Sequence, residues 1–237
     1  RPARTISWPD GRVALLGHLI GDGSYLSGQP LRYTTSSLEN AELVAAVAED
    51  EFGLTVNWRR GRGNWFQLIL SGNGDRWHPR GINYWLRDLG IFGQRSAEKR
   101  LPHAVFLLDD RQVALLLRHL WATDGTISSR GGASRGSAGV HFSTASSGLA
   151  CDVAALLLRL GIVARVRSVA QGASRWYTVN VSGRDFLMTF LVRVGGFGPR
   201  TRGAQALRKQ LFDSVHNTNV DTLPREVFTR VRERMAA

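Results

Sequence analysis

Two aspartates occupy equivalent places in the sequence and together could hold a divalent cation. Asp22 and Asp124 are 102 positions apart, and each ends an apolar, helix-prone run and precedes a glycine. Two carboxylates at the ends of adjacent helices repel each other and face the negative ends of both helix dipoles. An oxygen-preferring ion such as Mg²⁺ would offset that charge, so the pair predicts a metal site. For either aspartate alone, an ordinary Asp-Gly helix end is the competing interpretation.

The two aspartates belong to a sequence that repeats itself once. Five similar segments recur in the same order: residues 15–23 with 117–125, 33–37 with 142–146, 65–72 with 176–183, 91–95 with 196–200, and 101–106 with 223–228. One such match could arise by chance, but five in order predict two related halves. Repeats of this kind determine the architecture, so each half is expected to contain the same elements in the same order.

Apolar periodicity predicts the same order of elements in each half: helix, two strands, helix, two strands, helix. In the first half the expected helices are 11–21, 38–52 and 82–89, and the expected strands are 24–26, 31–35, 55–60 and 65–71. In the second half an apolar helical stripe covers 149–160, strands cover 163–168 and 176–182, and a helix lies near 185–194. Gly17 and Gly21 are expected to let two helices approach closely. Gly23 and Gly125 are expected to adopt the left-handed backbone that ends a helix.

The nonamers at 15–23 (LLGHLIGDG) and 117–125 (LRHLWATDG) resemble the two signature helices of LAGLIDADG endonucleases. The segment EKRLP at 98–102 resembles the lysine-plus-proline block of the intein-encoded members. The resemblance covers nearly the whole chain. It implies an α+β fold of two pseudo-symmetric αββαββα halves, 1–105 and 106–237, with packed signature helices and curved antiparallel DNA-binding sheets. The implied activity is that of a monomeric homing endonuclease, which makes a double-strand break in a long, non-palindromic DNA site by metal-dependent phosphodiester hydrolysis.

The resemblance also implies roles for individual residues. Asp22 and Asp124, with Gly21 and Thr123 beside them, correspond to the metal-binding positions. Lys99 corresponds to the lysine of the catalytic pocket, and a solvated surface lysine is the competing interpretation. Mg²⁺ is the expected ion, Mn²⁺ is expected to substitute for it, and Ca²⁺ is expected to support binding without cleavage.

The second half departs from the family pattern at two places. His119 stands at a helix-interface position where the first half has Gly17, and we interpret it either as a satisfied interface histidine or as a pH-sensitive polar contact. The alignment of 223–224 with 101–102 places Asp221 opposite Lys99, so the basic partner is missing there. The candidates to replace it are Lys209, Arg200 and Arg202. An active site with two acids and unequal basic support is therefore predicted.

The paired strands are expected to read DNA bases, because a curved β-ribbon fits the major groove and presents alternate side chains to it. Candidate DNA-binding residues lie on or beside the ribbons or in the Gly/Ser-rich loop 128–137. They are Arg32, Trp58, Arg59, Arg60, Arg62, Gln67, Arg130, Arg135, Arg165, Arg167, Arg175 and Asn180. Most are expected to contact phosphates and some to contact bases. For any one arginine, a solvated surface position is equally compatible.

The composition agrees with a polyanionic partner, since 31 basic and 19 acidic residues give a formal charge of +12. A single cysteine, Cys151, excludes an internal disulfide framework. No apolar run approaches the roughly 18–20 residues of a membrane span. We therefore expect an intracellular, cytoplasmic protein without a membrane segment.

Two other functions are compatible with the sequence: a LAGLIDADG-type protein that binds DNA without cutting it, and an RNA maturase. Retention of Asp22 and Asp124 argues against the first, and a preference for duplex DNA over structured RNA would exclude the second. The lysine block favours an origin inside an intein, where the chain would once have been fused to a splicing domain. Self-splicing is not expected, because the chain lacks an intein's terminal residues and 216–217 (His-Asn) is interpreted as a loop.

Overall fold

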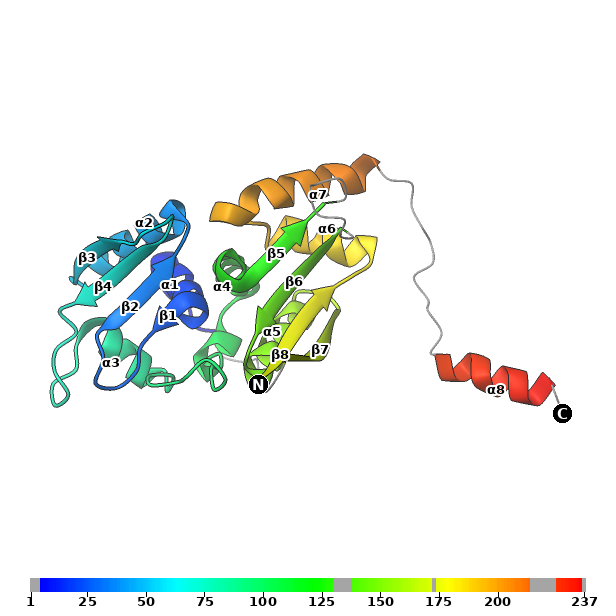
Figure 1. The fold of residues 1–237 in the computed structure, drawn as a ribbon, viewed down its shortest axis with the longest axis horizontal. Coiled ribbons are helices and arrows are strands. Elements are labelled where there is room, and N and C mark those ends of the chain that lie inside the picture. Colours follow the sequence, from blue (N-terminus) through cyan, green and yellow to red (C-terminus); the bar gives the residue numbers. More distant parts are fainter. Residues whose placement is uncertain (1–4, 130–137, 172–173, 214–224, 236–237) are drawn as a thin grey trace.

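In the computed structural model, which describes residues 5–129, 138–171, 174–213 and 225–235, two four-stranded sheets flank a central pair of helices (Figure 1). The central helices are α1 (Asp10–Asp22) and α4 (Asp110–Asp124). Both halves have the element order that the sequence predicted, so the α+β architecture of two related halves is confirmed.

The first half places its sheet and two further helices on one side of α1. Its elements are β1 (Gly23–Ser24), β2 (Leu31–Thr35), α2 (Leu38–Asp50), β3 (Thr55–Arg60), β4 (Phe66–Ser71) and α3 (Gly81–Asp88). The antiparallel sheet has the order β1-β2-β4-β3. A short 3₁₀ helix, η1 (His103–Leu107), then leads into α4.

The second half repeats this arrangement around α4. Its elements are β5 (Gly125–Ser128), β6 (Gly139–Thr144), α5 (Ser147–Arg159), β7 (Ala164–Gln171), β8 (Ser174–Val181) and α6 (Arg184–Arg193), and its sheet has the order β5-β6-β8-β7. The 3₁₀ helix η2 (Gly198–Arg200), α7 (Thr201–Asp213) and α8 (Arg225–Met235) follow. Neither α7 nor α8 was expected, although Ala204, Leu207 and Leu211 of α7 are buried at helical spacing.

The central helices run parallel and touch through small residues. Asp10 pairs with Arg111 at their beginnings, and Gly21 faces Thr123 at their ends. A Cβ atom at Gly17 would lie 2.9 Å from backbone atoms of α4, and one at Gly21 would collide with the Thr123 side chain. The predicted role of both glycines in close approach is confirmed, because larger residues would force the helices apart.

The predicted left-handed helix ends at Gly23 and Gly125 are wrong. Both glycines are extended, with φ of −80° and −84°, and each passes directly into the first strand of its half. Glycine is needed there for space, since a Cβ atom at Gly23 would meet the Leu19 backbone and one at Gly125 would meet the Trp121 side chain. Each helix therefore ends by turning straight into its sheet.

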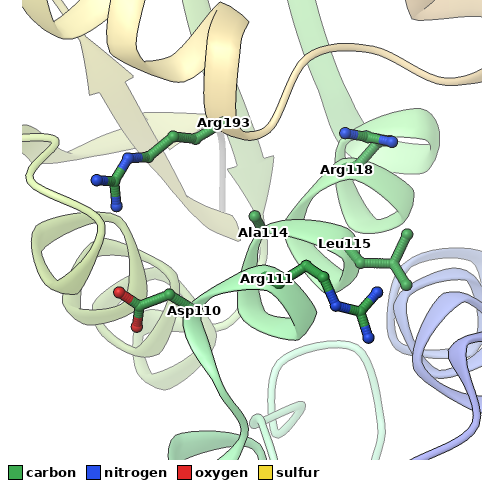
Figure 2. A pocket seen from close by; sticks show the side chains of 6 residues that line it. All are labelled: Asp110, Arg111, Ala114, Leu115, Arg118 and Arg193. Atoms are coloured by element: carbon green, nitrogen blue, oxygen red, sulfur yellow. The ribbon is translucent and has the colours of Figure 1, made fainter.

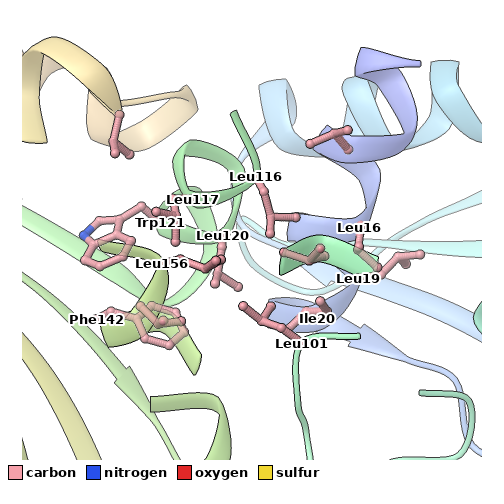
Figure 3. Close-up of a cluster of buried hydrophobic side chains, with 14 of the residues drawn as sticks. Leu16, Leu19, Ile20, Leu101, Leu116, Leu117, Leu120, Trp121, Phe142 and Leu156 are labelled. Carbon is pink, nitrogen blue, oxygen red and sulfur yellow. The ribbon is translucent and has the colours of Figure 1, made fainter. Parts of the chain in front are cut away.

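One apolar core joins the two halves. Leu16, Leu19 and Ile20 of α1 lie near Leu116 and Leu120 of α4 in the cluster of Figure 3. On the other side of α4 the core continues through Trp121, Phe142 and Leu156. Because this burial spans both halves, the central helices form a rigid support for the residues at their ends. Within the described ranges, every helix is too short or too polar to cross a membrane.

Candidate active site and nucleic-acid interface

The parallel packing of α1 and α4 brings Asp22 and Asp124 to the same end of the helix interface, as their last residues. The pKa of Asp22 is raised to about 7, mainly by burial and also by the charge of Asp124, while Lys99 and Arg200 oppose the shift. Burial likewise raises the pKa of Asp124, which the same two cations partly offset. The acids are therefore close enough to repel each other, and they lie in a setting that disfavours their charge.

Lys99 lies at the end of α1 and is almost buried, with 8% of its surface exposed. Its Nζ donates hydrogen bonds to the carbonyl oxygens of Gly21 (2.7 Å) and Gly23 (3.1 Å). It also lies 5.6 Å from the centre of the Tyr25 ring. Burial lowers the pKa of Lys99, and both aspartates act against that change. A solvated surface lysine is thus incompatible with the structure at this position.

Arg200 occupies the corresponding place at the end of α4. Its Nη2 donates to the Thr123 carbonyl (3.1 Å), and its Nε donates to the Trp121 carbonyl (3.4 Å). Burial lowers the pKa of Arg200, opposed by Asp124 and Asp22. Of the three candidates from the sequence, Lys209 and Arg202 are exposed on α7. Asp221, aligned with Lys99, lies outside the described residues.

A cavity of about 140 Å³ opens beside the acid pair. Its lining includes Lys99, Asp124 and the exposed aromatic Trp176. The candidate metal ligands nearby are carboxylate and carbonyl oxygens, which suit a hard divalent ion. No group of three or more His, Cys, Asp or Glu side chains with metal-binding geometry occurs within the described ranges. The two acids therefore fit Mg²⁺ only if water, carbonyl or phosphate oxygens complete the coordination.

A second hollow, of about 320 Å³, lies at the other end of α4 (Figure 2). Two of its arginines already have partners, since Arg111 pairs with Asp10 and Arg118 Nε donates to the Val194 carbonyl. This hollow is lined by the first residues of α4, so it is remote from the acid pair at the helix's last residue.

A buried polar chain crosses the helix interface one turn before the acids. His18 Nε2 lies 3.1 Å from His119 Nδ1, and His18 Nδ1 lies 2.9 Å from the Tyr33 hydroxyl. Burial lowers the pKa of His18 to about 3 and that of His119 to about 4. Of the two interpretations of His119, the satisfied interface histidine describes its contacts at neutral pH.

Each sheet has one face on the helices and one face turned away from them. Residues paired across an antiparallel ladder project to the same face. In the first sheet Leu68 and Leu70 are buried, so Gln67 and Ile69, which alternate with them along β4, point to the outer face. The residues paired with Gln67 and Ile69 lie on the same outer face: Arg32, Thr34, Asn57 and Arg59. In the second sheet Val179 and Val181 are buried, and the outer face carries His141, Ser143, Arg165, Arg167, Trp176, Thr178 and Asn180.

The candidate DNA-binding residues therefore divide between the two faces. Arg32, Arg59, Gln67, Arg165, Arg167 and Asn180 share the outer faces. Trp58 and Arg60 instead project with Leu68 and Phe66 toward the inner face, and Arg60 stacks over the Phe66 ring. Arg175 is paired with Ala170 on the inner face, and Arg62 lies in the β3–β4 turn. Arg130 and Arg135 lie outside the described residues. Strict alternation from the buried strand residues would have found the additional outer residues, Trp176 among them.

Comparison with known proteins relates part of this chain to a known family and its fold to solved structures. Residues 111–195 match the family model described as a LAGLIDADG-like domain. The fold is similar to that of the homing endonuclease I-DmoI solved with DNA and Mn: the TM-score is 0.54 and the identity 16%, over 79% of this chain and 98% of that one. I-DmoI with DNA and Ca gives a TM-score of 0.54 and 18% identity, over 84% and 98%. Residues 111–195 thus contain a LAGLIDADG-like domain, and the chain as a whole has a fold similar to that of I-DmoI.

Relatives by sequence are parts of larger proteins. The chain is 42% identical to the replicative DNA helicase DnaB of Rhodothermus marinus, over 98% of this chain and 25% of the relative. It is 27% identical to the protein RecA of Mycobacterium tuberculosis, over 81% of this chain and 25% of the relative. The chain thus spans about a quarter of the length of these relatives.

Proposed function

We propose that the chain is a metal-dependent endonuclease that cuts both strands of a long, non-palindromic DNA duplex. The observation that carries the proposal is the acid pair Asp22–Asp124, held between Lys99 and Arg200 at the end of the central helices. The raised pKa values make this arrangement costly to keep charged. Two buried carboxylates give no advantage to a protein that only binds a polyanion. Phosphodiester hydrolysis does require them, because they hold the cation that takes part in it.

The residues of the site have distinct roles in the proposed reaction. Asp22 and Asp124 would hold Mg²⁺, with Gly21 and Thr123 beside them at the helix ends. The ion would supply Lewis-acid activation of the phosphodiester and of the attacking water. Lys99 and Arg200, fixed on the last carbonyls of α1 and α4, would stabilise the negative charge that develops on the phosphate. The crystals of I-DmoI with DNA and Mn or Ca support Mn²⁺ and Ca²⁺ as alternative ions.

The outer faces of the two sheets would bind the DNA. They carry arginine, amide and hydroxyl side chains on both sides of the acid pair, and the whole chain has a formal charge of +12. Arginine and amide groups can recognise base edges in the major groove. Because the two faces differ in sequence, one chain acting as a monomer would recognise two different half-sites.

The relatives support an intein origin for the proposed endonuclease. Proteins with different names, DnaB and RecA, each match this chain over about a quarter of their length. A segment shared in this way by otherwise different proteins is what a transferable insert would leave. The proposed natural setting is therefore an insertion in a host protein, next to a splicing domain.

The test is cleavage of a plasmid library with randomised inserts, with Mg²⁺ and with Ca²⁺, followed by sequencing of the broken ends. A single long site cut with Mg²⁺ only, and not cut by Asp22→Asn or Asp124→Asn, would support the proposal. Asp50→Asn is the matched control, because Asp50 is also the last residue of a helix but is exposed on α2. Specific retention of one duplex without cleavage would favour the binding-only function, and preference for structured RNA would favour the maturase.

A further inference from the structure

The segment that carries Lys99 belongs to the first half but rests on α5 of the second half. The Lys99 carbonyl accepts a hydrogen bond of 2.7 Å from Ser146 Oγ. Ser146 is 1% exposed and also caps α5, since its Oγ accepts from the Leu149 backbone N–H at 3.1 Å. The helix cap and the lysine segment are thus joined through one hydroxyl group.

Asp152 holds the residues that follow Lys99. Its carboxylate accepts two hydrogen bonds of 2.7 Å from the Arg100 guanidinium and one of 3.1 Å from the Leu101 backbone N–H. Asp152 is 6% exposed, so this is a nearly buried carboxylate with three donors. A buried charge with this many partners fixes its neighbours more firmly than a surface ion pair does.

These contacts leave Lys99 with little freedom. Its own carbonyl is bound to Ser146, and the next two residues are bound to Asp152. With the backbone fixed on α5, the side chain extends to the end of α1, where Nζ bonds to Gly21 and Gly23. The ammonium position thus depends on groups of both halves.

The position equivalent to Asp152 in the other half does not carry a carboxylate. The repeat aligns Ser146 with Ser37, so Asp152 aligns with Leu43 of α2. The segment that carries Arg200 does approach α2, because a Cβ atom at Gly198 would collide with the Asn40 side chain. The Glu39 carboxylate of α2 also lies near Gly198, but among the described residues no hydrogen bond joins the Arg200 segment to a carboxylate of α2, and Arg200 itself donates to carbonyl groups of α4.

We infer that Asp152, together with Ser146, is a positioning residue for Lys99 and makes the first-half cation dependent on the folding of the second half. The catalytic consequence rests on the proposed endonuclease function. The positional claim does not, because it can be measured on the free protein.

The positional test uses the fact that the chain has two lysines, Lys99 and Lys209. Folded protein is acetylated with an amine-specific reagent, and mass spectrometry follows both sites. Lys209 is exposed and serves as the internal reference. Asp152→Ala should raise the labelling rate of Lys99 relative to Lys209 by about tenfold, because the segment can leave the helix end. Asp152→Asn, which keeps an acceptor for Leu101, should give a smaller rise and serves if the alanine variant does not fold.

The matched control is Asp10→Ala. It breaks another bidentate Asp–Arg pair between the halves, with Arg111, at the opposite end of the central helices. This variant should leave Lys99 as protected as in the wild type. Unchanged protection of Lys99 in both folded Asp152 variants would overturn the inference. So would labelling of Lys99 in Asp10→Ala that is as fast as in Asp152→Ala.

The catalytic test compares steady-state cleavage of the identified DNA site. Asp152→Ala should lower kcat about tenfold and leave KM within about twofold, because DNA binding by the sheets is unaffected. In a Lys99→Met background the same change should cost no further activity, since it acts through Lys99. An equal loss in both backgrounds would overturn the positioning role. If wild-type protein cleaves no DNA, the endonuclease proposal fails, and the labelling result still decides the position of Lys99.

Discussion

His18 and His119 face each other across the central helices with 3.1 Å between Nε2 of the first and Nδ1 of the second. The space between these nitrogens accommodates one proton, and Tyr33 occupies the other side of His18. Protonation of both rings would place two donors and two charges against each other inside the core. The contact therefore depends on neutral imidazoles.

The first prediction concerns acid stability. Folded-state pKa values of about 3 and about 4 lie below the ordinary 6.5, so below pH 6.5 the unfolded state binds more protons. This contribution to stability is complete above about pH 6.5 and is lost as pH falls toward 4. Between pH 7 and pH 5 the unfolding free energy of the wild type should fall by about 2 kcal/mol more than that of His18→Gln. Urea titration at both pH values measures this difference. The exposed His103→Gln is the control, and an unchanged loss in His18→Gln would contradict the prediction.

The second prediction concerns Asp22 in metal-free protein. Its folded-state pKa of about 7 lies above the ordinary 3.8, so its cost to stability develops as pH rises from about 4 to 7 and is complete above 7. Asp22→Asn should therefore be more stable than the wild type at pH 8, and this advantage should be about 3 kcal/mol larger at pH 8 than at pH 5. Mg²⁺ should raise the melting temperature of the wild type at pH 8 more than that of the variant. Calorimetry with and without Mg²⁺ checks both effects, and destabilisation at pH 8 would be the contrary result.

The third prediction is that the two cations serve different DNA strands. Lys99 bonds to the end of α1 and Arg200 to the end of α4, through different groups and geometries. Lys99→Ala and Arg200→Ala should each slow one strand by about 100-fold and the other strand less, so that nicked DNA accumulates. A duplex labelled differently on each strand measures this, with Lys209→Ala as the control. Equal slowing of both strands by both variants would argue for one shared role.

The fourth prediction uses adjacent arginines on opposite faces of β3. Arg59 shares the outer face with Gln67, whereas Arg60 projects inward over Phe66. Arg59→Ala should weaken DNA binding and reduce the salt dependence of the affinity by about one ion, because one phosphate or base contact is lost. Arg60→Ala should retain the wild-type salt slope. Fluorescence anisotropy across a salt series separates the two, and equal slopes would refute the assignment of faces.

The sequence predicted the repeated architecture because each half carries a strong local signal. Apolar periodicity located the central helices, and the Asp-Gly ends located the acid pair. The choice of Arg200 over Lys209 could not be made from sequence, because it depends on which loop reaches the end of α4. The prediction for Gly23 was wrong for a related reason. Glycine is required at this position by the lack of space beside Leu19 and not by its own backbone angle.

The inward position of Arg60 also escaped prediction. Charge suggested contact with DNA, but register against Phe66 decides the face, and an edge strand can keep a long cationic side chain partly solvated there. The contacts around Lys99 are likewise invisible in sequence, because Asp152 lies 53 positions away on helix α5.

The support of the lysine segment by α5 has a consequence for recombining halves of related proteins. A chimera that joins residues 1–105 of this chain to a foreign second half would receive Lys99 without the hydroxyl and carboxylate that hold it, unless the donor supplies them. Under the proposed endonuclease function, such a hybrid should retain both target preferences and still cut poorly. Grafting Ser146 and Asp152 into the donor helix is therefore the first repair to try when half-domains are exchanged to build a nuclease of new specificity.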